Sequence, residues 1–343
     1  MVRTVDLFCG GGLSSWGASM AGAEIVAAVD AWDVAARTFK RNFPHARVVN
    51  KRLSMDAGPE ILGRDIGKID LLIASPECTN HSIAKGNKPR DEESRRSGNF
   101  VVEFLRKMGS SAPRWVVLEN VTPLQNWKGY DGLLGGLRLL GYDAEPVVID
   151  ASEYGVPQAR KRLFVICDQE AKPRMPERTH VVPVTARTFI RPFGTWKAGP
   201  LFTPTRSENT LARARVGIAA LGEGKDFLVI YYGSDKAGGW QSLDRPLRTI
   251  TTLDRFGLVQ WHEGQPTLRM LQVPELRDAM GLAPRKPARG PSANFKLTEG
   301  NRRDQIRIIG NGVAAPVMTA IVRSLTTNVP VAISTLAPIA VAA

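Results

Sequence analysis

This chain of 343 residues has few cysteines, no long hydrophobic run, and no internal repeat or low-complexity block. Its three cysteines, Cys9, Cys78 and Cys167, are too few and too scattered for a disulfide framework or a structural zinc site. We therefore predict no metal centre and a reducing, cytoplasmic environment. Because no apolar run reaches the about 20 residues of a membrane-spanning helix, we predict no membrane association. The first strand is predicted so early that we expect no signal peptide.

Acidic residues are outnumbered by basic ones, 33 against 46, which gives a net charge of +13. Such an excess fits a polyanionic partner, nucleic acid first, although solvated surface charge produces the same balance. The hydrophobic fraction of 43% and the charged fraction of 23% are ordinary for a soluble globular protein. The length is sufficient for one large domain and a smaller one.

A glycine-rich turn follows the first predicted strand at residues 4–8. It contains Gly10, Gly11 and Gly12 and leads into a helix predicted at residues 14–21. Glycines permit a tight turn and close approach of a ligand to the backbone, and the helix N-terminus offers free amides. This strand, turn and helix favour a nucleotide-like cofactor, although such units also occur without one.

The second predicted strand, at residues 24–30, ends in the carboxylate of Asp30. In nucleotide-binding α/β units an acid at this place accepts hydrogen bonds from ribose hydroxyls. Trp32 follows two residues later, where its ring can stack on an adenine or pack into the core. Both side chains are therefore candidates for the cofactor site.

Two further predicted strands bring reactive residues to one edge of the sheet. The apolar run 68–72 predicts a buried strand that ends before Pro76, so Cys78 lies on the loop past its carboxyl end. The run 114–118 predicts the strand that delivers Glu119 to the same edge, where open α/β sheets bind ligands. The polar stretch 85–99 is predicted as a mobile active-site loop or, alternatively, as a solvated insertion.

An extended segment carries three polar side chains at alternate positions. Gln158, Arg160 and Arg162 are predicted to project to one face and to lead into a buried strand at residues 163–166. Other elements are predicted as helices at 33–42, 100–108, 133–140 and 316–324, and as a strand at 144–149.

The character of the chain changes at about residue 169, where the alternation of strands and helices is lost. Basic residues outnumber acidic ones there, and Tyr231, Tyr232, Trp240 and Trp261 are interleaved with glycine and polar residues. We predict a catalytic domain at 1–168, a smaller, irregular, β-rich recognition domain at 169–300, and a segment at 301–343 that rejoins the first domain. The recognition domain would hold a phosphate backbone and present loops to bases.

Six short motifs occur in order along the chain. They are Asp6-Leu7-Phe8-Cys9-Gly10-Gly11-Gly12, Pro76-Glu77-Cys78, Glu119-Asn120-Val121, Gln158-x-Arg160-x-Arg162, Arg245-Pro246-x-x-Thr249 and Gly310-Asn311-Gly312-Val313. This series, with a variable basic segment before the fifth motif, resembles the bacterial or phage DNA (cytosine-5)-methyltransferase family over nearly the whole chain. The resemblance implies an α/β fold, with a Rossmann-like mixed-sheet methyltransferase domain and the smaller recognition domain.

The resemblance also implies a reaction and a set of site residues. A methyl group would pass from S-adenosylmethionine to carbon 5 of a cytosine flipped out of double-stranded DNA, through a covalent Cys78 adduct at carbon 6. The implied catalytic residues are Cys78, Glu119, Arg160 and Arg162. The implied cofactor-binding residues are Phe8, Gly10, Gly12, Leu13, Asp30, Trp32, Asn311 and Val313, and the implied substrate-binding residues are Ser82, Asn120, Gln158 and Thr249.

Three features depart from the family's pattern. Glu77 stands where the family usually has a proline, and we expect it to point away from Cys78, because an inward acid would raise the pKa of the thiol. The family usually has an aspartate after the third strand for the adenine amine, where this chain has Asn50-Lys51-Arg52-Leu53. The recognition segment is also short.

Three alternative functions remain at this stage. They are the same chemistry on transfer RNA, an amino-methyltransferase, and a catalytically impaired relative that only binds DNA. An amino-methyltransferase would leave Glu119 and the arginine-containing strand unexplained. We expect a monomer in the cytoplasm, associated with the nucleoid through DNA, and leave open a cognate restriction endonuclease and the target sequence.

Overall fold

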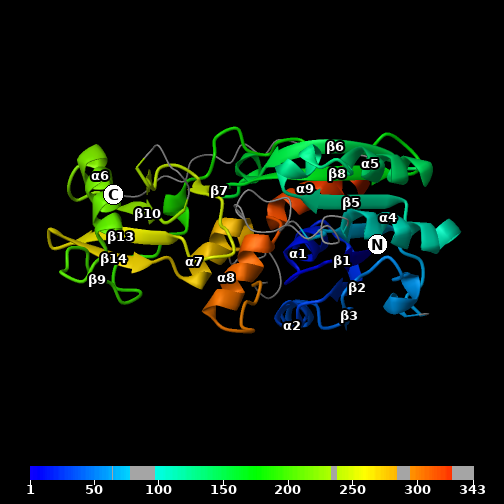
Figure 1. Ribbon diagram of the computed structural model, residues 1–343, viewed down its shortest axis with the longest axis horizontal. Coiled ribbons are helices and arrows are strands. Elements are labelled where there is room, and N and C mark those ends of the chain that lie inside the picture. The colour runs from blue at the N-terminus through cyan, green and yellow to red at the C-terminus, as the bar shows by residue number, and fades with distance from the viewer. Residues whose placement is uncertain (64, 78–96, 233–237, 284–293, 327–343) are drawn as a thin grey trace.

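The computed structural model describes residues 1–63, 65–77, 97–232, 238–283 and 294–326. Two sheets lie along the long axis of the molecule (Figure 1). The strands of the larger sheet come from the N-terminal half of the chain. Helices α7 (Val273–Arg277) and α8 (Arg302–Asn311) lie between the larger and the smaller sheet. The mixed α/β architecture predicted from the sequence is confirmed.

The main sheet has seven strands, of which the first five are parallel. Strand β8 is antiparallel to both of its neighbours. Across the sheet the strands are β3 (Arg47–Asn50), β2 (Glu24–Asp30), β1 (Arg3–Leu7), β4 (Leu71–Ala74), β5 (Trp115–Asn120), β8 (Lys161–Asp168) and β6 (Asp143–Asp150). Six of these were predicted within a few residues. Strand β3 was not predicted, because it has only two apolar residues, Val48 and Val49.

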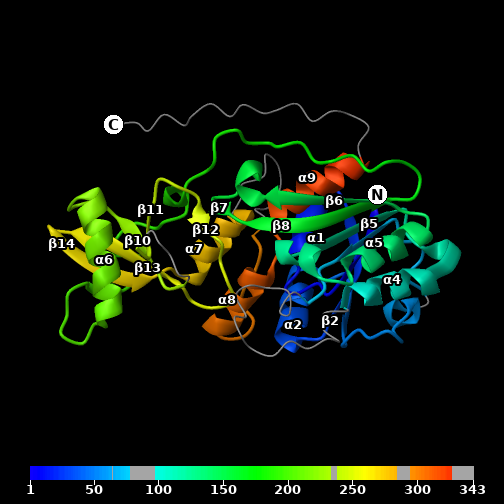
Figure 2. The same ribbon diagram turned by 45° about the horizontal axis from the view of Figure 1, so that its top comes forward.

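Side chains of the buried strands alternate between the two faces of the main sheet. Leu71 and Ile73 pack on the face covered by α1 (Leu13–Met20) and α9 (Ala315–Thr326). Leu72 and Ala74 pack on the opposite face, covered by α4 (Ser97–Met108) and α5 (Tyr130–Leu139). These two helices lie next to each other (Figure 2), and α2 (Asp33–Asn42) covers β2 and β3. A strand buried on both faces explains the continuous apolar runs in the sequence.

The last three residues of the stretch predicted as an active-site loop, 97–99, belong to a helix instead. Helix α4 begins at Ser97, so residues 97–99 are helical, while residues 85–96 lie outside the described part of the chain.

The smaller sheet is antiparallel and more regular than the sequence suggested. Its strands are β11 (Trp240–Ser242), β10 (Phe227–Ile230), β13 (Phe256–His262), β14 (Gln265–Met270) and β9 (Gly199–Pro200). Helix α6 (Glu208–Leu221) packs on β10 and β11, and was not predicted. Leu211, Ala214, Ile218 and Leu221 lie on its packed side, but exposed apolar residues such as Val216 weaken the contrast between its faces.

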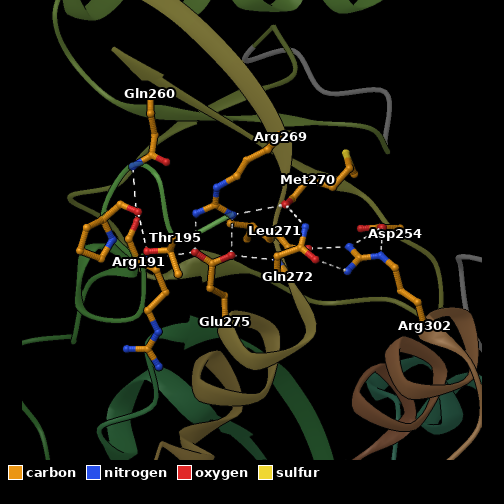
Figure 3. Close-up of polar contacts among 11 residues, drawn as sticks. Arg191, Thr195, Asp254, Gln260, Arg269, Met270, Leu271, Gln272, Glu275 and Arg302 are labelled. Atoms are coloured by element: carbon orange, nitrogen blue, oxygen red, sulfur yellow. Dashed lines mark hydrogen bonds and ion pairs between the residues drawn. The ribbon is translucent and has the colours of Figure 1, made fainter. Parts of the chain in front are cut away.

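Polar contacts join the smaller sheet to α7 and α8 (Figure 3). Both terminal nitrogens of Arg269 donate to the carboxylate of Glu275, at 2.7 and 2.8 Å. Arg302 on α8 donates to Asp254 and to the Leu271 carbonyl. Apolar residues of both sheets belong to one continuous core. The domain boundaries at 168 and 300 stay predictions.

The remaining elements are short. The pair β7 (Gln158–Ala159) and β12 (Leu247–Arg248) is parallel, and the short helical turns are η1 (Pro59–Leu62), η3 (Gly109–Ser111), η4 (Thr122–Asn126), η5 (Ala151–Tyr154), η6 (Ala186–Thr188) and the π-helical η7 (Asp278–Leu282). The span Arg302–Thr326 has the length and hydropathy of a membrane helix, but 61% of its apolar window is buried. It is made of α8 and α9, which are core helices.

Candidate active site

A cavity of about 600 Å³ opens at the carboxyl ends of the central strands of the main sheet. This is the edge at which open α/β sheets bind ligands, and the volume suits a molecule the size of a nucleotide. Its lining residues come from eight regions of the chain. They are Phe8, Cys9, Gly10, Gly11, Leu13, Ser14, Asp30, Ala31, Trp32, Arg52, Ser75, Pro76, Glu77, Glu119, Val121, Arg162, Thr252, Arg307, Ile308, Gly310, Asn311, Gly312 and Val313.

Asp30 holds the glycine-rich turn at one end of this cavity. Its two carboxylate oxygens accept hydrogen bonds from the amides of Gly10 and Trp32, both at 2.8 Å. The chain turns away from β1 with Phe8 and Gly10 at positive φ, 57° and 53°. Burial raises the pKa of Asp30, and the two amide hydrogen bonds oppose that rise. Each oxygen keeps a further acceptor position, so Asp30 can hold the turn and still bind a hydroxyl.

Seven of the eight residues predicted to bind a cofactor line the cavity: Phe8, Gly10, Leu13, Asp30, Trp32, Asn311 and Val313. The exception is Gly12, where an added Cβ would lie 2.8 Å from the ring of Phe39. Gly12 therefore faces the helix α2 and lets the turn pack closely there. Helix α1 begins directly after it without a side-chain cap, so its first amides remain available.

Trp32 is covered on one face by an arginine that sequence reasoning missed. The guanidinium of Arg307, on α8, lies 4.4 Å from the centre of the Trp32 ring. Trp32 is half-buried, packs against the core and lines the cavity. Its stacking on a ligand stays a prediction. Arg307 stands in a helix of mixed charge, where nothing in the sequence marked it.

The other end of the cavity holds a buried ion pair. The Nε atom of Arg162 lies 3.2 Å from Oε1 of Glu119, and the side chains are 15% and 7% exposed. Burial raises the pKa of Glu119, while the charges of Arg162 and Arg160 and the nearby hydroxyl of Ser75 oppose the rise. Glu119 is therefore a carboxyl group that takes up a proton more readily than usual.

Arg160 is placed differently from Arg162 and does not line the cavity. Its side chain is 2% exposed. It donates to the carbonyls of Ile250, Gly310 and Gly312, at 3.0, 2.7 and 2.8 Å. Gln158 and Arg160 both bond to the backbone of Ile250, whereas Arg162 reaches Glu119. The common face of the three side chains stays a prediction.

Gln158 and Thr249 also hold the backbone outside the cavity. The side chain of Gln158 accepts from the amide of Ile250 and donates to the Ala279 carbonyl. The hydroxyl of Thr249 donates to the Ala159 carbonyl. These bonds fix the segment that follows β12 against the segment that precedes β8. In this structure the two residues position the chain and do not line the cavity.

The loop that carries the predicted nucleophile is tied to β5. Asn120 donates from Nδ2 to the carbonyl of Pro76, at 3.1 Å, and accepts from the amide of Val121. Pro76 and Glu77 line the cavity. Cys78 and Ser82 lie outside the described residues.

The two cysteines that the structure describes are Cys9 and Cys167, and both are buried. Cys9 is 4% exposed beneath the glycine-rich turn, and Cys167 is fully buried in β8. Burial raises the pKa of both thiols. Neither is therefore suited to act as a thiolate nucleophile near neutral pH.

An acid lies beneath the turn that sequence reasoning left without a role. Asp6 is fully buried in β1 and accepts a hydrogen bond from the hydroxyl of Ser15, at 2.6 Å. Its Oδ1 atom has no hydrogen-bond partner among the described residues. Burial raises the pKa of Asp6 to about 7. A neutral carboxyl group at this position costs less than a buried charge.

Residues 2–194 match the model of the C-5 cytosine-specific DNA methylase family. The chain belongs to this family. Type II methyltransferase M.HgiDI of Herpetosiphon aurantiacus is 38% identical over 165 residues, which cover 48% of this chain and 52% of that protein. M.AgeI of Thalassovita gelatinovora is 30% identical over 171 residues, covering 48% and 39%. The chain thus spans about half the length, or less, of these two relatives.

Solved structures share the fold of this chain over most of its length. A putative DNA modification methyltransferase encoded within an E. coli prophage has a TM-score of 0.64 and 19% identity, covering 95% of this chain and 98% of that one. Spodoptera frugiperda DNMT2 has a TM-score of 0.65 and 16% identity, covering 95% and 99%. At these identities the likeness establishes the fold alone.

Proposed function

We propose that this protein transfers a methyl group from S-adenosylmethionine to carbon 5 of a flipped-out cytosine in double-stranded DNA. The observation that carries the proposal is a single cavity with the glycine-rich turn at one end and the buried Glu119–Arg162 pair at the other. Membership of the C-5 cytosine-specific family supports the choice of base and atom.

The residues at the first end of the cavity fit the proposed cofactor. Gly10 faces open space, with no atom within 4 Å of the position of a Cβ, so the backbone is accessible to a ligand. Asp30 would accept from ribose hydroxyls, Trp32 would contact the adenine, and the uncapped N-terminus of α1 would meet the carboxylate of the methionine part. When bound, the cofactor supplies an electrophilic methyl group.

The residues at the second end fit a cytosine ring. The raised pKa of Glu119 lets it hold a proton at ring atom N3, and Arg162 would donate to the cytosine carbonyl oxygen. Withdrawing electrons in this way favours addition of the Cys78 thiolate to carbon 6, which makes carbon 5 nucleophilic. After methylation, loss of the carbon 5 proton and cleavage of the sulfur–carbon bond would release the base and free Cys78.

Arg160, Gln158 and Thr249 support this site indirectly. Arg160 joins the turn after α8 to the segment after β12, and both segments reach the cavity through Gly310 and Thr252. At Gly310 an added Cβ would lie 2.3 Å from the carbonyl oxygen of Thr251, so glycine permits this close contact. We assign these residues a positioning role.

The smaller sheet and its loops would bind the DNA, with the net charge of +13 favouring a polyanion. We propose a monomeric cytoplasmic enzyme that is associated with the nucleoid through DNA. Resemblance to Type II methyltransferases makes a cognate restriction endonuclease a reasonable partner to search for.

Incubation with duplex DNA and methyl-labelled cofactor, followed by nucleoside analysis, tests the proposal. We expect the label in 5-methylcytosine. Label in N4-methylcytosine or N6-methyladenine would reject the reaction, and label in transfer RNA alone would reject the substrate. DNA binding without any transfer would favour the catalytically impaired alternative.

A further inference from the structure

Two residues that depart from the family's pattern meet at the mouth of the cavity. The Nη2 atom of Arg52 lies 3.5 Å from Oε1 of Glu77. Both residues line the cavity, and the carboxylate of Glu77 is close enough to Asp30 for its charge to raise the pKa of that group. Glu77 therefore points to the Asp30 end of the cavity, across from the Glu119–Arg162 pair.

The sheet order fixes which end of a bound nucleoside would lie near this pair. Strands β2 and β5, which carry Asp30 and Glu119, are separated by β1 and β4. Three strand spacings amount to roughly 14 Å. Because an acid at the end of the second strand binds ribose, the base would lie beyond Asp30, between Trp32 and the end of β3. Arg52 follows β3 by two residues.

The Arg52–Glu77 pair contributes little to the stability of the fold. The two side chains are 63% and 38% exposed, and exposed ion pairs stabilise proteins by about 0–1 kcal/mol. Both residues can therefore be replaced without loss of the fold. A function at the cavity mouth would explain a charged pair that contributes so little to folding.

We propose that Arg52 and Glu77 recognise the adenine edge of the cofactor; this inference rests on the proposed function. An adenine presents an acceptor, N1, beside a donor, the 6-amino group. A guanidinium only donates and a carboxylate only accepts. Arg52 donates to N1 while Glu77 accepts from the amino group, so the pair complements this edge. Hypoxanthine has the opposite arrangement, a protonated N1 beside a carbonyl oxygen, and the pair repels it at both positions.

Calorimetric titration of the full-length protein with S-adenosylhomocysteine and with S-inosylhomocysteine tests this assignment. Neither ligand carries a transferable methyl group, so binding is measured apart from catalysis. We expect the wild type to bind the adenosyl compound at least about tenfold more tightly. In Glu77→Ala and in Arg52→Ala the adenosyl affinity falls, and the preference shrinks to within about threefold. Glu77→Gln, whose amide oxygen still accepts, retains part of the preference.

The matched control is Asp244→Asn, which breaks the exposed pair with Arg187, at 2.8 Å, away from the cavity. We expect this variant to prefer the adenosyl compound as strongly as the wild type does. We expect unchanged melting temperatures in this variant and in the three variants of Arg52 and Glu77. An unchanged preference in both alanine variants, with wild-type adenosyl affinity, overturns the inference and leaves the proposed function intact. A wild type that binds neither compound overturns both.

Discussion

Two arginine–glutamate pairs, one beside the smaller sheet and one on the cavity at the main sheet, differ in how completely they are hydrogen-bonded. At the base of the smaller sheet, Arg269 and Glu275 are 3% and 0% exposed. The two oxygens of Glu275 accept four hydrogen bonds, two from Arg269, one from the amide of Arg191 and one from the amide of Gln272 (Figure 3). Both carboxylate oxygens are used by the fold.

The pair on the cavity wall is less constrained. Arg162 meets Glu119 through one nitrogen at 3.2 Å, and Glu119 has a pKa raised by burial. The four donors occupy both oxygens of Glu275, whereas the oxygens of Glu119 keep acceptor positions that face the cavity. We infer that the first pair fixes the fold, and we propose that the second binds a ligand.

Replacing Glu119 by Gln gives the largest expected effect on activity. The amide keeps the shape but cannot deliver a proton to N3, so we expect methyl transfer to fall by about 10²–10⁴. The melting temperature should change little, because Arg162 borders the open cavity. Initial rates with labelled cofactor measure the effect, and Glu145→Gln, at an exposed pair with Lys172, is the control. Activity within a factor of three of wild type would remove Glu119 from the mechanism.

Replacing Glu275 by Ala should affect stability instead. The change leaves Arg269 as a buried, uncompensated charge, which costs about 3–5 kcal/mol of unfolding free energy. Chemical denaturation measures the loss, and the folded fraction should keep a near-normal rate at low temperature. A stable but inactive Glu275→Ala protein would contradict the division between the two pairs.

The neighbouring arginines allow the same division to be tested within one segment. Arg160→Lys cannot reach all three carbonyls, and we expect a loss of about 1–3 kcal/mol in unfolding free energy. Arg162→Lys should leave stability nearly unchanged and reduce the rate of methyl transfer. Thermal melting and rate measurements on both variants are the comparison. The reverse pattern would show that Arg160 is the arginine that acts on the substrate.

The ionisation of Asp6 gives the smallest expected effect, which is a dependence of the unfolding free energy on pH. Its pKa is about 7 in the folded state against 3.8 for an unperturbed side chain. The folded protein keeps this proton over a range in which the unfolded chain has lost it. The unfolding free energy therefore falls as pH rises from about 4 to about 7, and the cost is fully present above pH 7.

The variant Asp6→Asn lacks this ionisation. Its stability advantage over wild type should increase by about 1–2 kcal/mol between pH 5.5 and pH 8.5. Denaturation curves at the two values measure it, and Asp244→Asn again serves as control. A constant difference between variant and wild type would mean that Asp6 does not titrate in this range.

The sequence predicted the main sheet well because its strands are apolar on both faces and are bounded by turn residues. It also predicted that Cys78, Glu119 and the glycine-rich turn follow strands of one sheet; the structure places Glu119 and the turn at one cavity and does not describe Cys78. The residues predicted to bind the cofactor, except Gly12, all line that cavity. Local pattern was enough for these features.

The features that were missed depend on distant parts of the chain. The contrast between Arg160 and Arg162 depends on the carbonyls that Arg160 binds, which lie about 90 and 150 residues away in the chain. Arg307 reaches Trp32 only because α8 packs beside the cavity. Helix α6 has weak amphipathicity and is stabilised by packing on β10 and β11. No pattern of neighbouring residues records such contacts.

The most direct test of the account uses duplex DNA in which cytosine is replaced by 5-fluorocytosine, together with S-adenosylmethionine. Fluorine at carbon 5 cannot leave as a proton, so the adduct formed after methyl transfer cannot resolve. We predict a denaturation-resistant complex between protein and DNA whose linked peptide contains Cys78, and no complex with Cys78→Ser. Linkage through Cys9 or Cys167, or methylation of ordinary DNA by Cys78→Ser, would contradict the proposed mechanism.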